Sequence, residues 1–213
     1  MQGKGKRTYH RGNVREDLLS AAEDILDTES LESITVRRLT STIGVTPGNF
    51  YNHFENLNEL LAHLGAKKLR AMSARTEAAR NRHRKPILRL RAAAREFIHL
   101  AADQPQAYQL MFGHLVAALN QYPIYLDAAE DAFEASVNDL YGEPVYDRND
   151  RKASHERCVH GYAMFALLNG LARDVIDGLV GFSSPEEIDQ FTDAVLDSLL
   201  QGRAFRDLEH RLG

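Results

Sequence analysis

The sequence predicts an all-α fold of about nine helices, with a small N-terminal three-helix domain and a larger helical C-terminal domain. Apolar residues recur three or four positions apart through most of the 213 residues, which is the spacing of one face of a helix. No segment alternates apolar and polar residues in the manner of a half-buried strand. We expect an arm at residues 1–12, the first domain at 13–68 and the second at 69–213.

The segment 35–54 predicts two short helices joined by a tight turn. Thr35 precedes the first helix, where its hydroxyl can accept from a first-turn N–H. An apolar stripe with helical spacing follows, made of Val36, Leu39 and Ile43. Gly44 then ends this helix, because glycine readily adopts the left-handed conformation that a sharp turn requires.

The second of these helices begins with a strong start pattern and has an unusual outer face. Thr46 is followed by proline at the first helical position, where the missing N–H costs nothing. The helix is expected over 47–53, and its outward residues are Pro47, Gly48, Asn49, Asn52 and His53. Small and amide-bearing side chains suit a helix that enters the major groove of DNA. The pattern therefore indicates a helix-turn-helix.

With these residues in view, the segment resembles the DNA-binding domain of the TetR family of transcriptional regulators. The resemblance covers residues 13–68. Its motifs are the apolar helix Val14, Leu18, Ala21, Ala22, Ile25 and Leu26, the Gly44-Val45 turn, the run Phe50-Tyr51-Asn52-His53-Phe54, and Glu59-Leu60-Leu61. At the start of the next helix the family usually places a lysine or arginine that meets a phosphate, and this chain has Leu57. Asn56 and Glu59 stand there with the spacing of a capping box.

The resemblance implies that double-stranded operator DNA of pseudo-palindromic sequence is the partner of this domain. Arg37 is expected at a base edge, and Gly48 lets the backbone come close. The expected base readers are Thr46, Pro47 and Asn49, and the expected phosphate contacts are Tyr51, Asn52 and His53. An alternative is that the segment is a helical hairpin inside a core, with Phe50, Tyr51 and Phe54 all packed, although its polar outer face argues against this.

Charge is distributed unevenly along the chain. Residues 1–85 hold 15 Lys and Arg against 10 Asp and Glu, whereas residues 86–213 hold 11 against 20. The first fifteen residues carry five cations and no acid: Lys4, Lys6, Arg7, Arg11 and Arg15. A basic front with a cationic arm favours contact with the phosphates of nucleic acid. A solvated arm without a role is the alternative.

Everything after the first domain has the pattern of helices. We expect helices over 57–82, 87–102, 105–112, 124–141 and 151–180 and a last one from Pro185, with a loop at 142–150. Ser184 has the position of a cap for the last helix, whose apolar residues are Ile188, Phe191, Val195 and Leu199. The last two helices are more apolar than a lone hairpin needs, which predicts a homodimer through a four-helix bundle.

The C-terminal part also resembles one branch of the TetR family, with weaker motifs. These are the stretch 102–112 and a His-Gly early in the family's eighth helix, matched by His160-Gly161. The resemblance implies a ligand-binding and dimerisation domain and a repressor that responds to an unknown small molecule. Candidate pocket residues are Phe97, Tyr108, Met111, Phe112 and Phe165. Each of these is by default a core residue.

Catalytic and metal sites are not expected. Glu96 and His99 form the only Glu-x-x-His pair, and a di-iron bundle needs two. His155 and Cys158 share a helical face without further ligands nearby. We therefore expect no enzyme, no metal and no cofactor. A dimeric helical interaction protein that no longer uses operator DNA is the second hypothesis, supported by Leu57, and a helical metalloenzyme is the third.

The cysteine content and the lack of a signal or membrane segment predict a cytoplasmic protein. One cysteine among 213 residues excludes an intramolecular disulfide and suits a reducing compartment. The 44% of hydrophobic residues are sufficient for a core without such a bond. The N-terminus lacks the apolar stretch of a signal peptide and no segment is apolar enough for a membrane span, so we expect no membrane partner.

Overall fold

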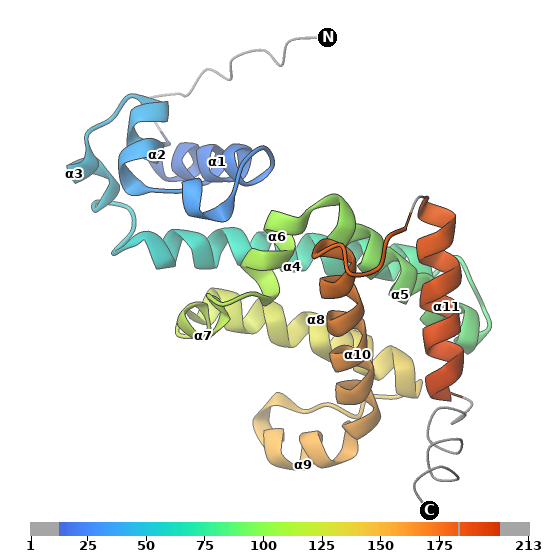
Figure 1. Cartoon of the computed structure of the whole chain (residues 1–213). Helices are drawn as coiled ribbons and strands as arrows, with labels where there is room; N and C mark the ends of the chain where they lie inside the picture. The colour runs from blue at the N-terminus through green and yellow to red at the C-terminus, as the bar shows by residue number, and fades with distance from the viewer. Residues whose placement is uncertain (1–12, 183, 201–213) are drawn as a thin grey trace, which may run out of the picture. The chain divides into compact units, whose positions relative to one another are not determined.

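The structure, a computed structural model, describes residues 13–182 and 184–200, and these are helical with no strand (Figure 1). The all-α prediction is confirmed, although the described residues form eleven α-helices where about nine were expected. The α-helices are α1 (Val14–Leu26), α2 (Val36–Ile43), α3 (Pro47–Phe50), α4 (Leu57–Arg80), α5 (Pro86–Asp103), α6 (Pro105–Phe112), α7 (Val116–Leu119), α8 (Pro123–Tyr141), α9 (Arg151–Arg157), α10 (Val159–Ile176) and α11 (Pro185–Leu200). Two short 3-10 helices are η1 (Leu31–Ser33) and η2 (Arg148–Asp150).

The chain divides into two compact units. The first comprises the residues up to Leu69 together with Gln106–Ala129, and the second comprises Arg70–Pro105 together with the residues from Glu130 on. All three boundaries fall inside helices, one within α4, one after the first residue of α6 and one within α8. Among the described residues, no helix combines the length and the apolar character needed to cross a membrane.

The first three helices pack around a small apolar core in the first unit. Leu18, Leu39 and Phe50 have no exposed surface. Thr35 caps α2 by accepting from the N–H of Arg38 at 3.3 Å, and Gly44 ends that helix with φ 75°. The left-handed value explains the glycine, because a side chain there would be strained. α3 ends earlier than expected, since residues 51–53 continue as turns rather than as helix.

The N-terminal half of α4 packs closely against the start of α8 in the same unit. A Cβ atom on Gly65 would lie 2.9 Å from the ring of Tyr125, so only glycine allows this approach. The Tyr125 hydroxyl donates to the carbonyl of Met111 at 2.6 Å, which ties α8 to α6. Burial raises the pKa of Tyr125 to about 12.

We expect Tyr125→Phe to lower the free energy of unfolding near neutral pH by about 1 kcal/mol, because a buried carbonyl loses its donor. The raised pKa means that tyrosine binds its proton more tightly in the folded state. The contribution of this tighter proton binding to the free energy of unfolding is present below pH 10 and is lost as the pH rises toward about 12. Urea unfolding of both proteins across this range tests the prediction, and an identical pH dependence would contradict it.

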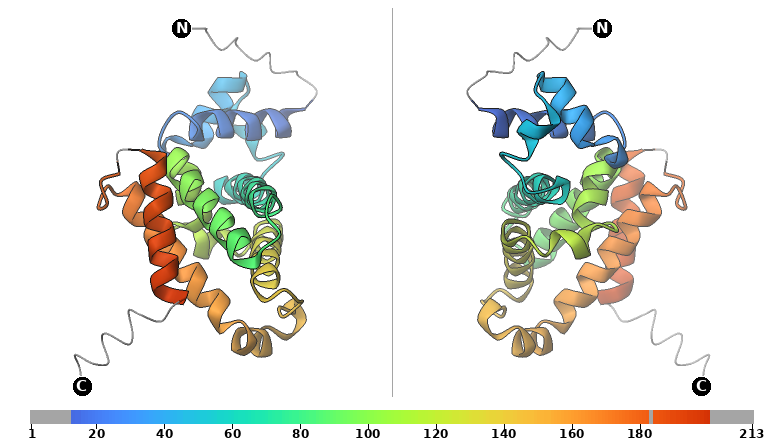
Figure 2. Two further views of the ribbon diagram at one scale, coloured as in Figure 1. Left: turned by 90° about the vertical axis from the view of Figure 1, so that its right-hand side faces the viewer. Right: turned by 90° about the vertical axis from the view of Figure 1, so that its left-hand side faces the viewer.

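In the second unit, α5 packs against both α10 and α11 (Figure 2). The buried centre of this packing is Ala94 on α5, Met164 on α10 and Leu196 on α11. Four partly buried residues surround it: Leu90, Leu167, Leu168 and Leu199. Apolar burial at this junction holds the last two helices to the unit.

A ladder of ion pairs runs beside this apolar seam. It joins Arg91, Arg95 and His99 on α5 to Asp189, Asp193 and Asp197 on α11, and we call it the α5–α11 charge ladder. Partners on each helix recur four residues apart, so they lie on one face. Although burial opposes it, hydrogen bonds from Arg95 and Arg91 keep the pKa of Asp193 below its usual value.

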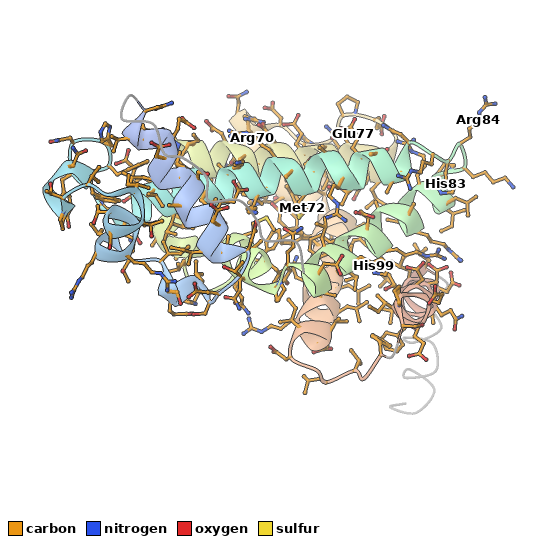
Figure 3. The ribbon with its side chains drawn as sticks, turned by 90° about the horizontal axis from the view of Figure 1, so that it is seen from above. Arg70, Met72, Glu77, His83, Arg84 and His99 are labelled. Carbon is orange, nitrogen blue, oxygen red and sulfur yellow. The ribbon has the colours of Figure 1, made fainter. Side chains whose placement is uncertain are left out.

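The turn between α4 and α5 is rich in cations. Arg80 and Arg89 both pair with Asp139 of α8, and Arg89 also donates to the carbonyl of Arg80 at the end of α4. Figure 3 shows His83 and Arg84 in this turn, beyond the end of α4. It also labels Met72, which is buried. The ion pairs of Asp139 with both Arg80 and Arg89 fix α8 against this corner.

The single helix expected over 151–180 is wrong, because the chain breaks into α9 and α10 at Cys158. At the break, the backbone of Cys158 has φ −98° and ψ 21°, which departs from helical values. Cys158 is fully buried, with its Sγ 3.8 Å from the carbonyl of Val145. The loop before α9 is bonded to the same helical face, since the N–H of Asp147 donates to Ser154 Oγ at 2.8 Å. α10 itself ends at Ile176, before Gly178, whose φ is 70°.

Gly161 brings α10 against α8. A Cβ atom there would lie 2.7 Å from Val137 Cγ2, and Val137 is buried and β-branched, so it has little freedom to move. This contact supplies a packing reason for the glycine of the His160-Gly161 pair. Gly170, on the same helix, faces open space within this chain.

We expect Gly161→Ala to lower the free energy of unfolding by about 1–3 kcal/mol through overpacking. Gly170→Ala is the matched control, since alanine is favoured by up to about 1 kcal/mol over glycine inside a helix and meets no neighbour. Chemical denaturation of both variants separates the two effects. A Gly161→Ala protein as stable as the control would show that the close contact carries no constraint.

Candidate nucleic-acid-binding surface

The outer face of α2 and α3 presents most of the residues that the sequence singled out for DNA contact. Exposed positions are Arg37, Thr46, Pro47, Gly48, Tyr51 and Asn52, whereas Asn49 and His53 are half-buried. Tyr51 is 59% exposed. The structure thus places the eight predicted residues on α2, on α3 and in the turns before and after α3.

An aromatic core holds this face in place from below. Phe50 and Phe54 are buried with their ring centroids 5.6 Å apart. The ring of Tyr51 meets that of Phe50 edge-on at 5.3 Å, although most of Tyr51 remains exposed. The packed-hairpin alternative required all three aromatic residues inside, and Tyr51 does not fit it.

Asn49 has an unsatisfied polar atom. Its Oδ1 is enclosed and has no hydrogen-bond donor among the residues that the structure describes. A buried amide oxygen without a donor costs free energy, and because this atom has almost no exposed surface a ligand would reach it only after the Asn49 side chain turns outward. The neighbouring turn is satisfied, since the N–H of Asn49 donates to the carbonyl of Thr46 at 2.9 Å.

The two consecutive arginines of α2 have different surroundings. Arg38 is bound through its guanidinium to the carboxylate of Glu29, one bond measuring 2.7 Å. Arg37 is exposed and forms no ion pair within residues 13–182 and 184–200. Arg37 is therefore the cation of α2 that remains available to a ligand. Nothing in the sequence pattern indicated the pairing of Arg38.

The N-terminus of α4 is capped from two directions. Asn56 Oδ1 accepts from the N–H of Glu59 at 3.1 Å and from the hydroxyl of Tyr122 at 3.0 Å. The Glu59 carboxylate accepts from the N–H of Glu55 at 2.5 Å, one residue earlier than in a standard capping box. Leu57, which stands where the TetR pattern has a cation, is half-buried. The sequence pattern indicated the Asn56 cap but not the contact with Tyr122.

Basic residues near the N-terminus divide into two groups. Lys4, Lys6, Arg7 and Arg11 lie outside the described residues. Arg15 packs instead, with its guanidinium 4.7 Å from the ring centroid of Phe54 and Nη2 2.7 Å from His63 Nε2. Arg15 therefore joins α1 to α4, which the charge count alone did not indicate.

The candidate pocket residues are distributed over both units. Tyr108 and Met111 are buried and Phe112 is half-buried in the first unit, where the rings of Tyr108 and Phe112 lie 5.2 Å apart. In the second unit, Phe97 is buried and Phe165 is 41% exposed. The Phe165 ring meets that of Phe133 edge-on at 5.9 Å.

The side chains that the sequence suggested as possible metal ligands contact other residues instead. Glu96 Oε1 lies 2.6 Å from Arg75 Nη2, and His99 Nε2 lies 2.8 Å from Asp189. The ring of His155 meets that of Tyr162 edge-on at 5.1 Å. Burial raises the pKa of the Cys158 thiol, which disfavours the thiolate that a metal would bind. In the part of the chain that is described, no three His, Cys, Asp or Glu side chains are grouped to hold a metal.

Comparison with known proteins identifies the fold. No protein-family model and no curated protein matches the sequence. Solved structures do match: a transcriptional regulator from Rhodococcus sp. RHA1 is 22% identical with a TM-score of 0.64, and the alignment covers 88% of this chain and 96% of that one. A TetR-family regulator from Streptomyces coelicolor is 19% identical with a TM-score of 0.61, covering 92% and 98%.

The fatty acid degradation regulator FadR from Bacillus halodurans is 15% identical with a TM-score of 0.62, and the alignment covers 91% of this chain and 97% of FadR. Each match extends over most of both proteins, so the shared architecture includes the C-terminal helices as well as the helix-turn-helix. The chain has the fold of the TetR-family transcriptional regulators.

Proposed function

We propose that the chain is a sequence-specific DNA-binding transcriptional regulator. The observation that carries the proposal is the two-sided helix-turn-helix, in which Phe50 and Phe54 are buried while the outer face is polar and exposed. A polar face on a short, firmly held helix is suited to base edges in the major groove. The TetR fold of the whole chain supports the same function.

Within this proposal the exposed residues have separate roles. Arg37 reaches a base edge, and Thr46, Pro47 and Asn49 read bases, with Gly48 allowing close approach. Tyr51, Asn52 and His53 hold phosphates, as do Lys4, Lys6, Arg7 and Arg11 of the arm. The proposed role of Asn49 requires its side chain to turn toward the groove, where Oδ1 would accept from the N6 amino group of adenine.

In this proposal the regulator is a cytoplasmic homodimer that represses transcription by binding a pseudo-palindromic operator. A small-molecule effector releases the dimer from the operator. Dimerisation is supported by large apolar side chains left exposed on the last two helices, which are Val159, Tyr162, Phe165, Phe191 and Leu200. The effector would change the separation of the two DNA-binding heads, whose match to the helical repeat of DNA sets the affinity. The pocket residues named above are its proposed contacts.

Selection of bound duplexes from a random pool, followed by a screen for ligands that release them, tests the function. A selected palindromic sequence with salt-dependent binding is the expected result. If the pool yields no enriched duplex, the second hypothesis, a helical interaction protein without operator DNA, is favoured, and Leu57 remains its sequence support.

Asn49 and Tyr51 lie two residues apart and should behave differently. Asn49→Ala should lose about 1–3 kcal/mol on the selected operator and relax the preference at one base pair. Tyr51→Phe removes a phosphate contact and should weaken operator and unrelated duplex by similar factors. Binding titrations of both variants on the operator and on the unrelated duplex, at one salt concentration, test this difference. An unchanged ratio between the duplexes for Asn49→Ala would mean that another residue reads the base.

Deletion of residues 1–11 should weaken binding to all duplexes by similar factors. Every phosphate that the arm no longer neutralises reduces the slope of log affinity against log salt by about 0.9. Titrations over a range of salt concentrations measure this slope for the full chain and the deletion. Equal slopes would show that the arm does not bind phosphates.

Phe191→Asp should convert the dimer to a monomer, because a charge buried at an apolar interface without a partner costs several kcal/mol by order of magnitude. Phe191 is 38% exposed in the single chain and contacts Phe182. Leu199→Asp is the comparison: Leu199 packs against the buried centre of the second unit, so its replacement should unfold the chain instead. Sedimentation and circular dichroism distinguish the outcomes, and a monomeric wild-type protein would refute the dimer.

A further inference from the structure

Two side chains from the segment 106–122 form hydrogen bonds with residues just before and just after the helix-turn-helix. Gln106 Oε1, at the start of α6, accepts from the backbone N–H of Leu31 at 2.8 Å. The hydroxyl of Tyr122, just before α8, donates to Asn56 Oδ1 at 3.0 Å. Both bonds are partly buried and both lie within the first compact unit.

The two bonded positions enclose the whole DNA-binding motif. Leu31 is buried and begins η1, shortly before α2, and Asn56 lies between α3 and α4. Residues 32–55 therefore form a stretch whose two ends are held by side chains distant in sequence. A hydrogen bond at each end restricts rotation of the stretch more than either bond alone would.

The holding segment is itself firmly packed. Leu110 and Leu119 have no exposed surface, and Tyr125 lies in the gap that Gly65 leaves on α4. Tyr122 lies one helical turn before Tyr125, and its carbonyl accepts from the N–H of Tyr125 at 3.0 Å. The position of the Tyr122 hydroxyl is thus set by the packing of α8 on α4.

The contact at Asn56 is separable from the helix cap. Asn56 Oδ1 uses one lone pair for the N–H of Glu59 and the other for Tyr122. Removal of the Tyr122 hydroxyl therefore leaves the cap of α4 in place and breaks only the connection between segments. A change at Tyr122 can alter the orientation of the motif without melting α4.

We propose that Gln106 and Tyr122 are positioning residues that fix the orientation of the helix-turn-helix for operator DNA. The proposal rests on the proposed function. Neither residue needs to touch DNA to change the affinity for operator.

The test compares variants that break the connection with matched controls. Tyr122→Phe and Gln106→Met each remove one bond. Tyr125→Phe makes the same chemical change one turn later but breaks a bond inside the segment, and Gln106→Glu keeps an acceptor at Oε1. Affinities for the selected operator and for a scrambled duplex are measured at one salt concentration, together with the free energy of unfolding.

We expect Tyr122→Phe and Gln106→Met each to lower operator affinity by about three- to ten-fold, the size of one net hydrogen bond. Affinity for the scrambled duplex should fall less, so the ratio decreases. Tyr125→Phe and Gln106→Glu should keep the wild-type ratio, whatever stability they lose. An unchanged ratio for Tyr122→Phe, or an equal decrease in Tyr125→Phe, would overturn the proposal in favour of a purely structural role.

Hydrogen exchange tests the positioning role separately from the proposed function, because it is measured without DNA. In the absence of DNA, Tyr122→Phe should speed exchange at the amides of residues 52–59, and Gln106→Met at Leu31, with α10 unchanged as the internal reference. Failure of the wild-type protein to bind any duplex would refute the proposed function alone. Unchanged exchange at those amides would refute the positioning role even if operator binding is found.

Discussion

The close approach of α8 to α4 at Gly65 is the constraint on which the first compact unit depends. Because no Cβ atom stands between them, the ring of Tyr125 lies against α4 and its hydroxyl reaches the carbonyl of Met111. One glycine thus sets the positions of α6 and α8 together. The hydroxyl of Tyr122, one turn earlier, then meets Asn56, so a packing detail in the middle of α4 determines how the end of the helix-turn-helix is held.

The helix-turn-helix divides its residues between two tasks. The inner aromatic residues Phe50 and Phe54 supply the burial that a four-residue helix cannot obtain from its own hydrogen bonds, since short helices are unstable alone. The outer residues contribute little to that stability and are available to a ligand. Asn49 belongs to neither group, because it is half-buried with an unsatisfied oxygen. A buried polar atom left without a partner makes this side-chain conformation costly.

Sequence patterns predicted the local structure well and the long-range contacts poorly. Thr35 as a cap and Gly44 as the left-handed end of α2 are confirmed, because capping and turn chemistry involve neighbours in sequence. The break at Cys158 was missed, because no glycine or proline stands at that point of the sequence to mark it. The contact between Gly65 and Tyr125 was not predictable either, because a glycine inside a helical pattern does not indicate which ring will fill the space beside it. Of the candidate DNA contacts, exposure agrees with the expectation for Arg37 and Tyr51, while their roles remain predictions.

The α5–α11 charge ladder holds α11 to α5 without fixing its register. Because its cations and anions each repeat every four residues, a slide of α11 by one turn would re-form most of the pairs. Only groups at the ends of the ladder would lose their partners, His99 after a slide in one direction and Asp189 after a slide in the other. The register is set instead by apolar burial beside the ladder, where Leu196 has no exposed surface and packs with Ala94 and Met164. Loss of that burial, rather than of the ion pairs, is the main cost that a displacement of α11 would meet.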